Sequence, residues 1–349
     1  DERDRYFSPE RSDLEETFFK HCLRAIDSIQ DGVHGLPLME GGDWNDGMDQ
    51  VGGESVWLAM FLCEVLRLFT PCCPAEEQNR LSKRRERYMQ AIDHFAWDGG
   101  WYLRGWYQNG AALGSAQNQE CRIDLLPQCW GVLCGVSRDR CATAMANAWS
   151  MLYQPDTGVL DLFTPPFDGQ EQPGYIAGYL PGVRENGGQY THAACWAVAA
   201  LHQQGEDARA WELALRMLPT SHSATAQLAA RYRAEPYVMA ADVYDNPQQR
   251  GRGGWTWYTG SASWYIYVLL THLLGFQKQG NRLRFRPVLP AGWEGIRLTY
   301  HYGGSTYHLR VSRDCQRAQC DGEFLQDGCL ILQDDGRIHE AVFPMRSGG

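Results

Sequence analysis

Three glycine-rich segments of the 349-residue sequence bring acidic, aromatic and imidazole side chains close together. The first, residues 41–49 (GGDWNDGMD), holds three carboxylates and an indole. Its glycines let the backbone approach a ligand closely. A carboxyl beside a tryptophan can have its pKa raised and then act as a general acid near neutral pH. A Ca²⁺ loop is an alternative, although it lacks the usual spacing and closing Glu, and Asp49 also suits a helix N-cap.

The second segment, residues 184–192 (RENGGQYTH), places Glu185 and His192 seven residues apart across a Gly-Gly bend. A helix is expected to begin at the end of this segment, so His192 would lie near a helix N-terminus, where anions are favoured. The two side chains could then converge on one ligand. The alternative is a capping Thr191 and a histidine packed in the core.

The third segment, residues 251–261 (GRGGWTWYTGS), offers hydroxyl groups and glycine-flanked N–H groups from Thr259 to Ser261, just before an apolar stretch. Such groups at a helix start can hold an anion. The segment is not a P-loop, because it lacks the GxxxxGK[ST] pattern. A glycine-rich turn before an N-capped hydrophobic helix is the alternative.

Helices must position these segments, and apolar residues at helical spacing predict them. They are expected over residues 14–29, 55–68, 82–95, 124–133, 138–152, 192–203, 207–218 and 261–274. The intervening segments rich in Gly, Pro and Trp are residues 35–53, 97–121, 163–190 and 244–260. Loops this long in a compact protein are usually functional, so the chemistry is expected there.

After residue 275 the apolar residues alternate with polar ones, which predicts strands. The strands are expected over residues 282–286, 296–302, 306–312, 322–324 and 329–332. We therefore predict a mainly α domain over residues 1–275 and an antiparallel β-sandwich module over residues 276–349, with the boundary near residues 276–280.

Composition excludes some classes of function. The chain has 32 Lys and Arg against 42 Asp and Glu, a net charge of −10, which disfavours nucleic acid or an anionic membrane surface as partner. Its 12 cysteines lack CxxC or paired Cys/His spacing, so we predict reduced thiols in a cytoplasmic protein and no metal site. The high aromatic content of 12% suits a cleft that stacks on sugar rings, or simply a large core.

Taken together, the three segments resemble glycoside hydrolase family 94, the inverting β-glucoside phosphorylases. The matching stretches are GDWNDGM (42–48), ENGGQYTHA (185–193) and WTWYTGSASW (255–264). The resemblance covers essentially the whole chain. It is nearest to the C-terminal region of cyclic β-1,2-glucan synthases and to 1,2-β-oligoglucan phosphorylases.

The resemblance implies roles for individual residues. Asp46 looks like the general acid, and inorganic phosphate is the co-substrate that attacks the anomeric carbon, so no cofactor is implied. The implied phosphate-binding groups are His192, Thr259 and the backbone of Gly260. The implied sugar-binding residues are Trp44, Asn45, Glu185 and Trp257. Arg122 and Asp124 also face the cleft in this interpretation, with a core or ion-pair role as the alternative.

The resemblance also implies a fold and an activity. The fold is part of an (α/α)6 barrel followed by a jelly-roll-like β-sandwich, and the chain looks like a fragment, because it begins without Met and family members carry further upstream elements. The implied activity is phosphorolysis of β-linked glucans, with β-1,2-linked glucans expected, and release of α-glucose 1-phosphate. We expect a cytoplasmic location, with the parent protein membrane-associated. The alternatives are an inverting hydrolase with Glu185 as base or a non-catalytic glucan-binding remnant, and a homodimer is left open.

Overall fold

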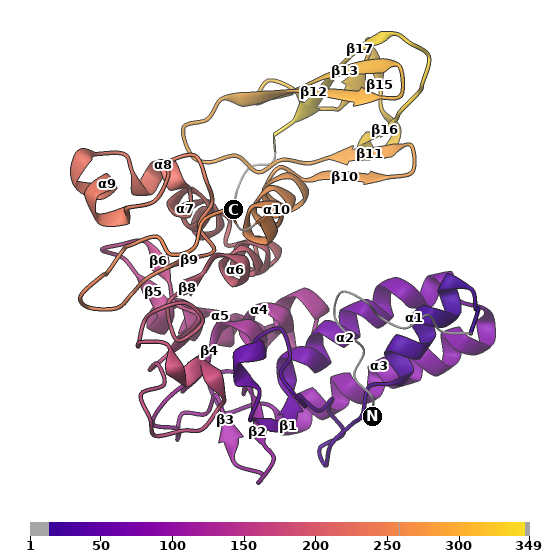
Figure 1. Ribbon diagram of the computed structural model, residues 1–349. Helices are drawn as coiled ribbons and strands as arrows, with labels where there is room; N and C mark the ends of the chain where they lie inside the picture. The colour runs from indigo at the N-terminus through magenta and orange to yellow at the C-terminus, as the bar shows by residue number, and fades with distance from the viewer. Residues whose placement is uncertain (1–13, 258, 346–349) are drawn as a thin grey trace.

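The computed structural model describes residues 14–257 and 259–345. Four helices lie side by side in chain order as an inner row (Figure 1). They are α2 (Val56–Phe69), α4 (Leu125–Cys134), α6 (Thr191–Gln204) and α10 (Thr259–Val268). Three outer helices, each packed on the inner helix before it, are α3 (Ala75–Phe95), α5 (Arg138–Leu152) and α7 (Asp207–Arg216). The helical part is therefore a series of helix pairs.

Inner and outer helices differ in residue type. The inner helix α6 is apolar nearly all round, and residues 193–201 are all buried. The outer helix α3 buries Leu81, Tyr88 and Ile92 and presents charged residues elsewhere. A helix that is apolar all round must be covered on every side, whereas an amphipathic helix covers a core with one face. Residue type thus decides which helices form the inner row.

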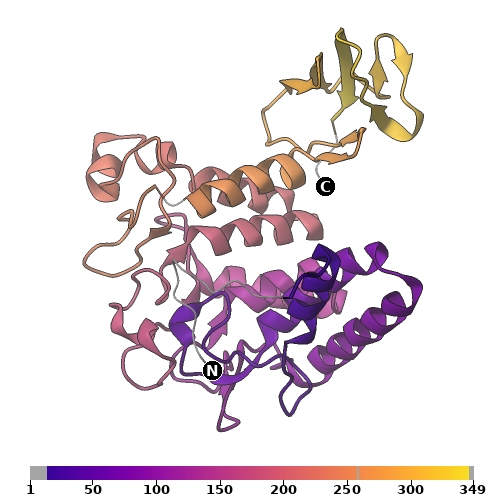
Figure 2. The same cartoon turned by 45° about the vertical axis from the view of Figure 1, so that its right-hand side comes forward.

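The inner helices all begin at the same end of the row, because each outer helix returns the chain to it. Strands β1 (Gly52–Ser55), β4 (Ile123–Asp124) and β8 (Gln189–Tyr190) lead directly into α2, α4 and α6. The short strands gather at this end, on the left and along the lower edge in Figure 1, and Figure 2 shows α6 and α10 running side by side away from it. The segments that carry chemistry therefore lie at one end of the row.

Other short elements tie these loops together. Strand β1 pairs with β2 (Gly105–Tyr107), which pairs with β3 (Ala112–Leu113). Strand β4 pairs with β7 (Phe163–Thr164), and β8 pairs with β9 (Asp242–Val243). Strands β5 (Tyr153–Gln154) and β6 (Val159–Leu160) pair with each other. The remaining α-helices are α1 (Phe18–Asp27), α8 (Pro219–His222) and α9 (Ala226–Tyr232). Short 3-10 turns are η1 (Asp46–Met48), η2 (Thr70–Cys72) and η3 (Tyr175–Gly178), and a π-helical turn, η4 (Leu269–Leu273), continues α10.

The C-terminal region consists of two small sheets. The three-stranded sheet has the order β10 (Phe276–Gln279), β11 (Arg282–Phe285) and β16 (Cys329–Ile331). The five-stranded sheet has the order β12 (Gly295–Tyr302), β13 (Ser305–Ser312), β17 (Ile338–Pro344), β14 (Gln319–Cys320) and β15 (Glu323–Phe324), with the turn η5 (Gln326–Gly328) before β16. The ring of Phe285 meets Phe343 at 5.3 Å between centroids, so side chains of the two sheets share a core.

Each of the eight predicted helices is present, with ends shifted by a few residues, and α3 begins seven residues before the prediction, at Ala75. The prediction of a wholly antiparallel module was wrong, because β13 and β17 pair in parallel. Strand β17 was not predicted, since its buried positions include His339 and Ala341 rather than a clear apolar alternation. Strand β10 lies where a linker was expected.

Of the (α/α)6 prediction, the alternation of inner and outer helices is present. Over the described ranges the inner row does not close into a ring of helices, so the structure is an open series of helix pairs followed by a C-terminal sheet region. No helix of this part of the chain is long and apolar enough to cross a membrane.

Candidate active site

A buried arginine fixes the first glycine-rich segment onto the helical row. Arg104 is fully buried, and its guanidinium donates to both oxygens of Asp43, at 2.6 and 2.7 Å, and to Ser55 Oγ at 3.2 Å. Ser55 Oγ in turn donates to Asp43 Oδ2 and accepts from the N–H of Leu58, which caps α2. Because both oxygens of Asp43 are engaged in this way, the structure argues against the Ca²⁺ loop. The loop from Asp43 onward is thereby anchored at the start of an inner helix.

The same arginine holds the start of the next inner helix. Arg104 Nε lies 3.3 Å from Asp124 Oδ2, while Asp124 Oδ1 accepts from the N–H of Leu126 and caps α4. Burial raises the pKa of Asp124 to about 6, although the nearby Arg104 opposes this shift. Asp124 therefore lies beneath the loops as part of an ion pair, which is the alternative that the sequence left open. Arg122 is exposed, and its Nε donates to the carbonyl of Asn118.

The predicted general acid lies at the surface of this anchored loop. Asp46 begins the turn η1 and is exposed, in contrast to its buried neighbours Asn45 and Gly47. Partial burial and the Asp46 carboxylate both raise the pKa of the Tyr175 hydroxyl, which places that phenol beside Asp46. Asp49 does not cap the following helix; its Oδ1 accepts from the N–H of Tyr175. Two carboxylates of one loop thus contact the turn η3 in different ways.

Trp44 connects the first loop to the second. Its Nε1–H donates to His192 Nδ1 at 3.3 Å, and its ring contacts Tyr190 and Trp196 edge-on or tilted. Because Nδ1 accepts a hydrogen bond, the proton of the neutral imidazole is assigned to Nε2. Burial lowers the pKa of His192 to about 4, so the ring is neutral at pH 7.

The Nε2 atom of His192 is buried and finds no hydrogen-bond partner among the described residues. The ring is also 5.4 Å from that of Trp264, on α10, so His192 lies between two inner helices. Asn45 is likewise buried with neither amide atom hydrogen-bonded within the described ranges. Buried polar groups are normally satisfied, so these two side chains are suited to a ligand.

The second and third segments meet around Arg184. Its guanidinium lies 3.3 Å from Glu185 Oε2 and stacks 4.1 Å above the ring of Trp255. Asp242, in β9, accepts from the N–H of Trp255, and burial raises the pKa of Asp242 to about 6. Burial and then Glu185 raise the pKa of Tyr190. Glu185 therefore sits among cationic and aromatic groups rather than in open solvent.

The third segment ends at the start of α10. Trp257 is 67% exposed and its Nε1 donates to Glu235 Oε1 at 3.2 Å. Gly260 is exposed in the first turn of α10, and no heavy atom lies within 4 Å of the position a Cβ would take. The helix begins at Thr259, whose side chain lies outside the described part of the structure, as does Tyr258.

Sequence reasoning missed three residues that shape this end of the molecule. Arg104 stands in the apolar run YLRGWY, where a lone charge was the available signal of a buried ion pair. Tyr175, in η3, and Asp242, in β9, belong to segments whose sequence has no pattern that relates them to Asp46 or Trp255. The assembled arrangement combines an exposed carboxyl group, an imidazole N–H without a partner among the residues described, and several helix N-termini. It can supply a proton and bind an anion.

Comparison with known proteins identifies relatives of this chain. Cyclic beta-(1,2)-glucan synthase NdvB of Rhizobium meliloti is 42% identical over 91% of the chain and 12% of that protein. Solabiose phosphorylase of Paenibacillus borealis is 30% identical over 95% of the chain and 44% of that protein. The 1,2-beta-oligoglucan phosphorylase of Listeria innocua is 28% identical over 32% of the chain and 12% of that protein. The chain thus spans less than half the length of these relatives.

Sequence models of protein families match most of the chain. The C-terminal domain of glycosyl hydrolase family 65 matches residues 276–319. The catalytic domain of the glycosyl hydrolase 94 superfamily matches residues 6–275. This range includes all three glycine-rich segments and Arg104 with its partners Asp43 and Asp124. The chain therefore belongs to the glycosyl hydrolase 94 superfamily.

Proposed function

We propose that this chain is the catalytic part of an inverting phosphorylase that acts on β-linked glucans, with β-1,2-glucans as the substrate class. Similarity to a β-1,2-glucan synthase and to phosphorylases supports the class. The observation that carries the proposal is His192, a neutral imidazole whose Nε2–H is buried without a partner in the described structure, at the end where inner helices begin. Such a donor at helix N-termini is suited to phosphate.

Asp46 is the proposed general acid that protonates the glycosidic oxygen. It is exposed, while the loop that carries it is fixed by the Arg104–Asp43 pair, so the carboxyl is accessible and positioned at once. Phosphate then attacks the anomeric carbon from the opposite face and the configuration is inverted. An inverting hydrolase needs a second carboxylate to activate water, whereas here phosphate itself is the nucleophile.

The proposed phosphate site consists of His192, Thr259 and the backbone N–H of Gly260. Its support is the contact between the His192 and Trp264 rings, which packs His192 against α10, the helix that begins at Thr259. The partial positive charge of a helix N-terminus favours an anion there. Neither a metal nor an organic cofactor is needed for this chemistry.

The proposed sugar site lies among aromatic groups of all three loops. Trp44, Asn45 and Glu185 are assigned to it, with Trp257 at its exposed edge. The Asn45 amide, which has no hydrogen-bond partner in the part of the chain that the structure describes, and the Arg184 guanidinium beside Glu185 support polar contacts to sugar hydroxyls. Asp124 is assigned a supporting role, because it is fully buried against Arg104.

The proposal extends to the helical architecture. We infer that the inner row is part of an (α/α)6 barrel, since inner and outer helices alternate along the chain as helix pairs do in such a barrel. The helical domain is proposed to end at residue 275 and the sheet module to follow.

All 12 cysteines are free, which supports a cytoplasmic location. A homodimer is the proposed oligomeric state, and light scattering of the purified protein would show twice the mass of one chain.

The test of function is phosphate dependence. The full-length protein is incubated with β-1,2-gluco-oligosaccharides, with and without inorganic phosphate, and glucose 1-phosphate and free glucose are measured. Glucose 1-phosphate that forms only with phosphate is the expected result. Free glucose formed at the same rate without phosphate would instead support a hydrolase with Glu185 as base. Oligosaccharide binding without any turnover would support a non-catalytic glucan-binding protein.

A further inference from the structure

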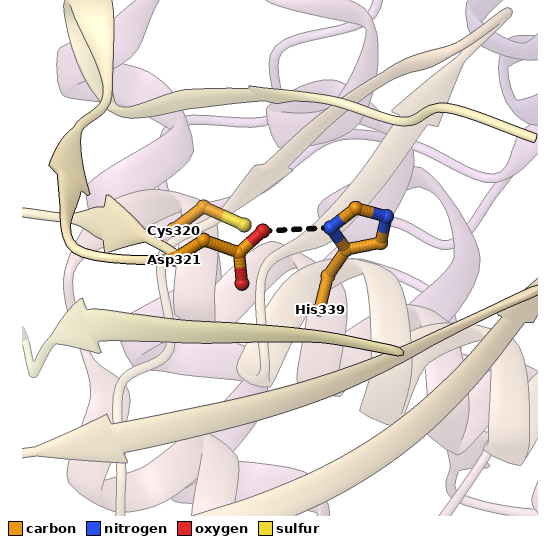
Figure 3. Close-up of side chains that lie close together, drawn as sticks. All are labelled: Cys320, Asp321 and His339. Atoms are coloured by element: carbon orange, nitrogen blue, oxygen red, sulfur yellow. Dashed lines mark hydrogen bonds and ion pairs between the residues drawn. The ribbon is translucent and has the colours of Figure 1, made fainter. Parts of the chain in front are cut away.

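The C-terminal sheet region holds a cluster of possible metal ligands outside the candidate active site. Cys320 ends β14, Asp321 follows it, and His339 is the second residue of β17. One ligand atom from each side chain lies within 4.8 Å of the others. Figure 3 shows the sulfur, the carboxylate and the imidazole pointing toward one another.

Backbone pairing holds Asp321 in this position. Its N–H donates to the carbonyl of Glu340, and its Oδ1 accepts from the N–H of Glu340 at 2.8 Å. One carboxylate oxygen is therefore used by the backbone of β17. The other, Oδ2, lies 2.7 Å from His339 Nδ1, so it faces the centre of the cluster.

The imidazole of His339 is oriented by two further contacts. Its ring stacks on that of Tyr307, at 4.6 Å between centroids and 18° between planes. Its Nε2 lies 3.1 Å from Asp335 Oδ1, and Asp335 is itself fixed by hydrogen bonds that involve Ser305 and the N–H of Arg337. Histidines that bind metals commonly donate their second ring N–H to a carboxylate in this way. The arrangement leaves Nδ1 directed at Cys320 and Asp321.

We propose that Cys320, Asp321 and His339 bind a zinc ion, with Asp335 as the outer carboxylate that orients the histidine. Thiolate, imidazole and carboxylate are the three ligand types that zinc takes in proteins. Bond lengths of about 2.0–2.3 Å from zinc to N, O and S bring pairs of ligand atoms to roughly 3–4 Å, so side-chain movements of less than an ångström or so suffice. A water molecule completes the tetrahedron.

A proton competes with the metal for this position. A proton on Nδ1 of His339 bridges to Asp321, and hydrogen bonds to Asp321 and Asp335 raise the pKa of the imidazole. Burial raises the pKa of the Cys320 thiol to about 12, and a bound metal displaces such a proton outright. Zinc binding therefore releases protons, whereas a histidine that merely links two carboxylates keeps them.

The proposed ion would join the short strand β14 to the central strand β17 of the five-stranded sheet. Strands β14 and β15 are short, with two residues each, and β14 pairs with β17 over Gln319–Val342 and Cys320–Ala341. A ligand set drawn from the end of β14 and the start of β17 fastens β14, and with it the edge strand β15, to β17. Because zinc binds the folded chain, its addition is expected to raise the thermal unfolding temperature.

Cobalt substitution tests the proposal directly. The metal-free 349-residue chain is titrated with Co²⁺, and a thiolate-to-cobalt charge-transfer band that Zn²⁺ removes is the expected result. The band is expected to disappear in Cys320→Ser. It is expected to persist in Cys315→Ser, a matched control whose thiol instead contacts the carbonyl of Arg317.

The outer carboxylate provides a second test that retains all three ligands. Asp335→Asn is expected to weaken zinc affinity by about 10–100-fold, measured by competition with a chelating dye. Asp334→Asn is the control, because Asp334 contacts the N–H of Gly304. A wild-type chain that shows no thiolate-to-cobalt band at micromolar metal overturns the proposal, and so does an unchanged affinity in Asp335→Asn. His339 is then a charged link between Asp321 and Asp335 only.

Discussion

At the scale of single residues, the candidate active site contains two kinds of side chain. Some are buried and hydrogen-bonded within the protein, and others are exposed or lack a hydrogen-bond partner in the described structure. Both oxygens of Asp43 accept hydrogen bonds from the buried Arg104 guanidinium, while Asp46, three residues after Asp43, is exposed. His192 uses Nδ1 to accept from Trp44 and leaves Nε2 without a partner in the described structure. The proposed proton donor, Asp46, and the proposed anion-binding N–H of His192 thus both come from segments held by buried contacts.

Replacement of the proposed acid is the first prediction. Asp46→Asn is expected to lower kcat for phosphorolysis by about 10²–10⁴-fold, because the amide cannot protonate the leaving oxygen. The KM for glucan is expected to change little. Asp49→Asn is the matched control, since it lies in the same loop and an amide oxygen can still accept from the N–H of Tyr175. Equal losses in both variants would show that the loop, not the Asp46 carboxyl, matters.

The second prediction concerns the protonation of His192. With a pKa lowered to about 4 by burial, the ring is expected to remain in the neutral Nε2–H form at pH 5.5, as measured by ¹⁵N NMR of labelled histidine. In Trp44→Phe, which removes the donor to Nδ1, the two neutral tautomers are expected to mix. Because the unfolded chain binds this proton near pH 6.5, the residue favours unfolding as pH falls from 6.5 to 4. An imidazolium signal that appears near pH 6.5 would contradict the assignment.

The third prediction tests the buried arginine. Arg104→Met leaves Asp43 and Asp124 without their buried cation, so the free energy of unfolding is expected to fall by about 3–5 kcal/mol. Urea denaturation measures this change. Arg122→Met, at an exposed arginine whose Nε donates to a backbone carbonyl, is expected to cost much less. A similar small loss for both variants would refute the anchoring role of Arg104.

At the scale of elements, four inner helices bring their N-termini to one end, and short strands join the loops that precede them. The third glycine-rich segment fits there because Gly254 passes close to Asp242. A Cβ on Gly254 would lie 2.1 Å from Asp242 Oδ1, whereas a Cβ on Gly178 would have no heavy atom within 4 Å. The packing of this loop therefore requires a residue without a side chain at position 254.

The fourth prediction follows from that close approach. Gly254→Ala is expected to displace the loop from Asp242 and to lower the free energy of unfolding by about 1–3 kcal/mol, as overpacking does. The KM for glucan is expected to rise, because Trp255 and Trp257 move with the loop. Thermal unfolding and steady-state kinetics measure both effects, with Gly178→Ala as the control. An unchanged KM in Gly254→Ala would remove the third loop from the sugar site.

At the scale of the whole molecule, the sequence was informative where one residue type dominates an element. The apolar inner helices and the glycine-rich loops were predicted within a few residues, because helical periodicity and loop composition are local signals. Strand β17 and its parallel pairing with β13 were not, since its buried face includes His339. The ion-pair role of Asp124 depends on Arg104, which is distant in sequence. Such pairings arise only when the chain folds.

The stereochemistry of the product tests the central claim most directly. If Asp46 is the acid and phosphate the nucleophile, proton NMR of the full-length protein with β-1,2-glucan and phosphate is expected to show α-glucose 1-phosphate as the first product. None is expected without phosphate. The β-anomer, or free glucose that accumulates in the absence of phosphate, would contradict the account.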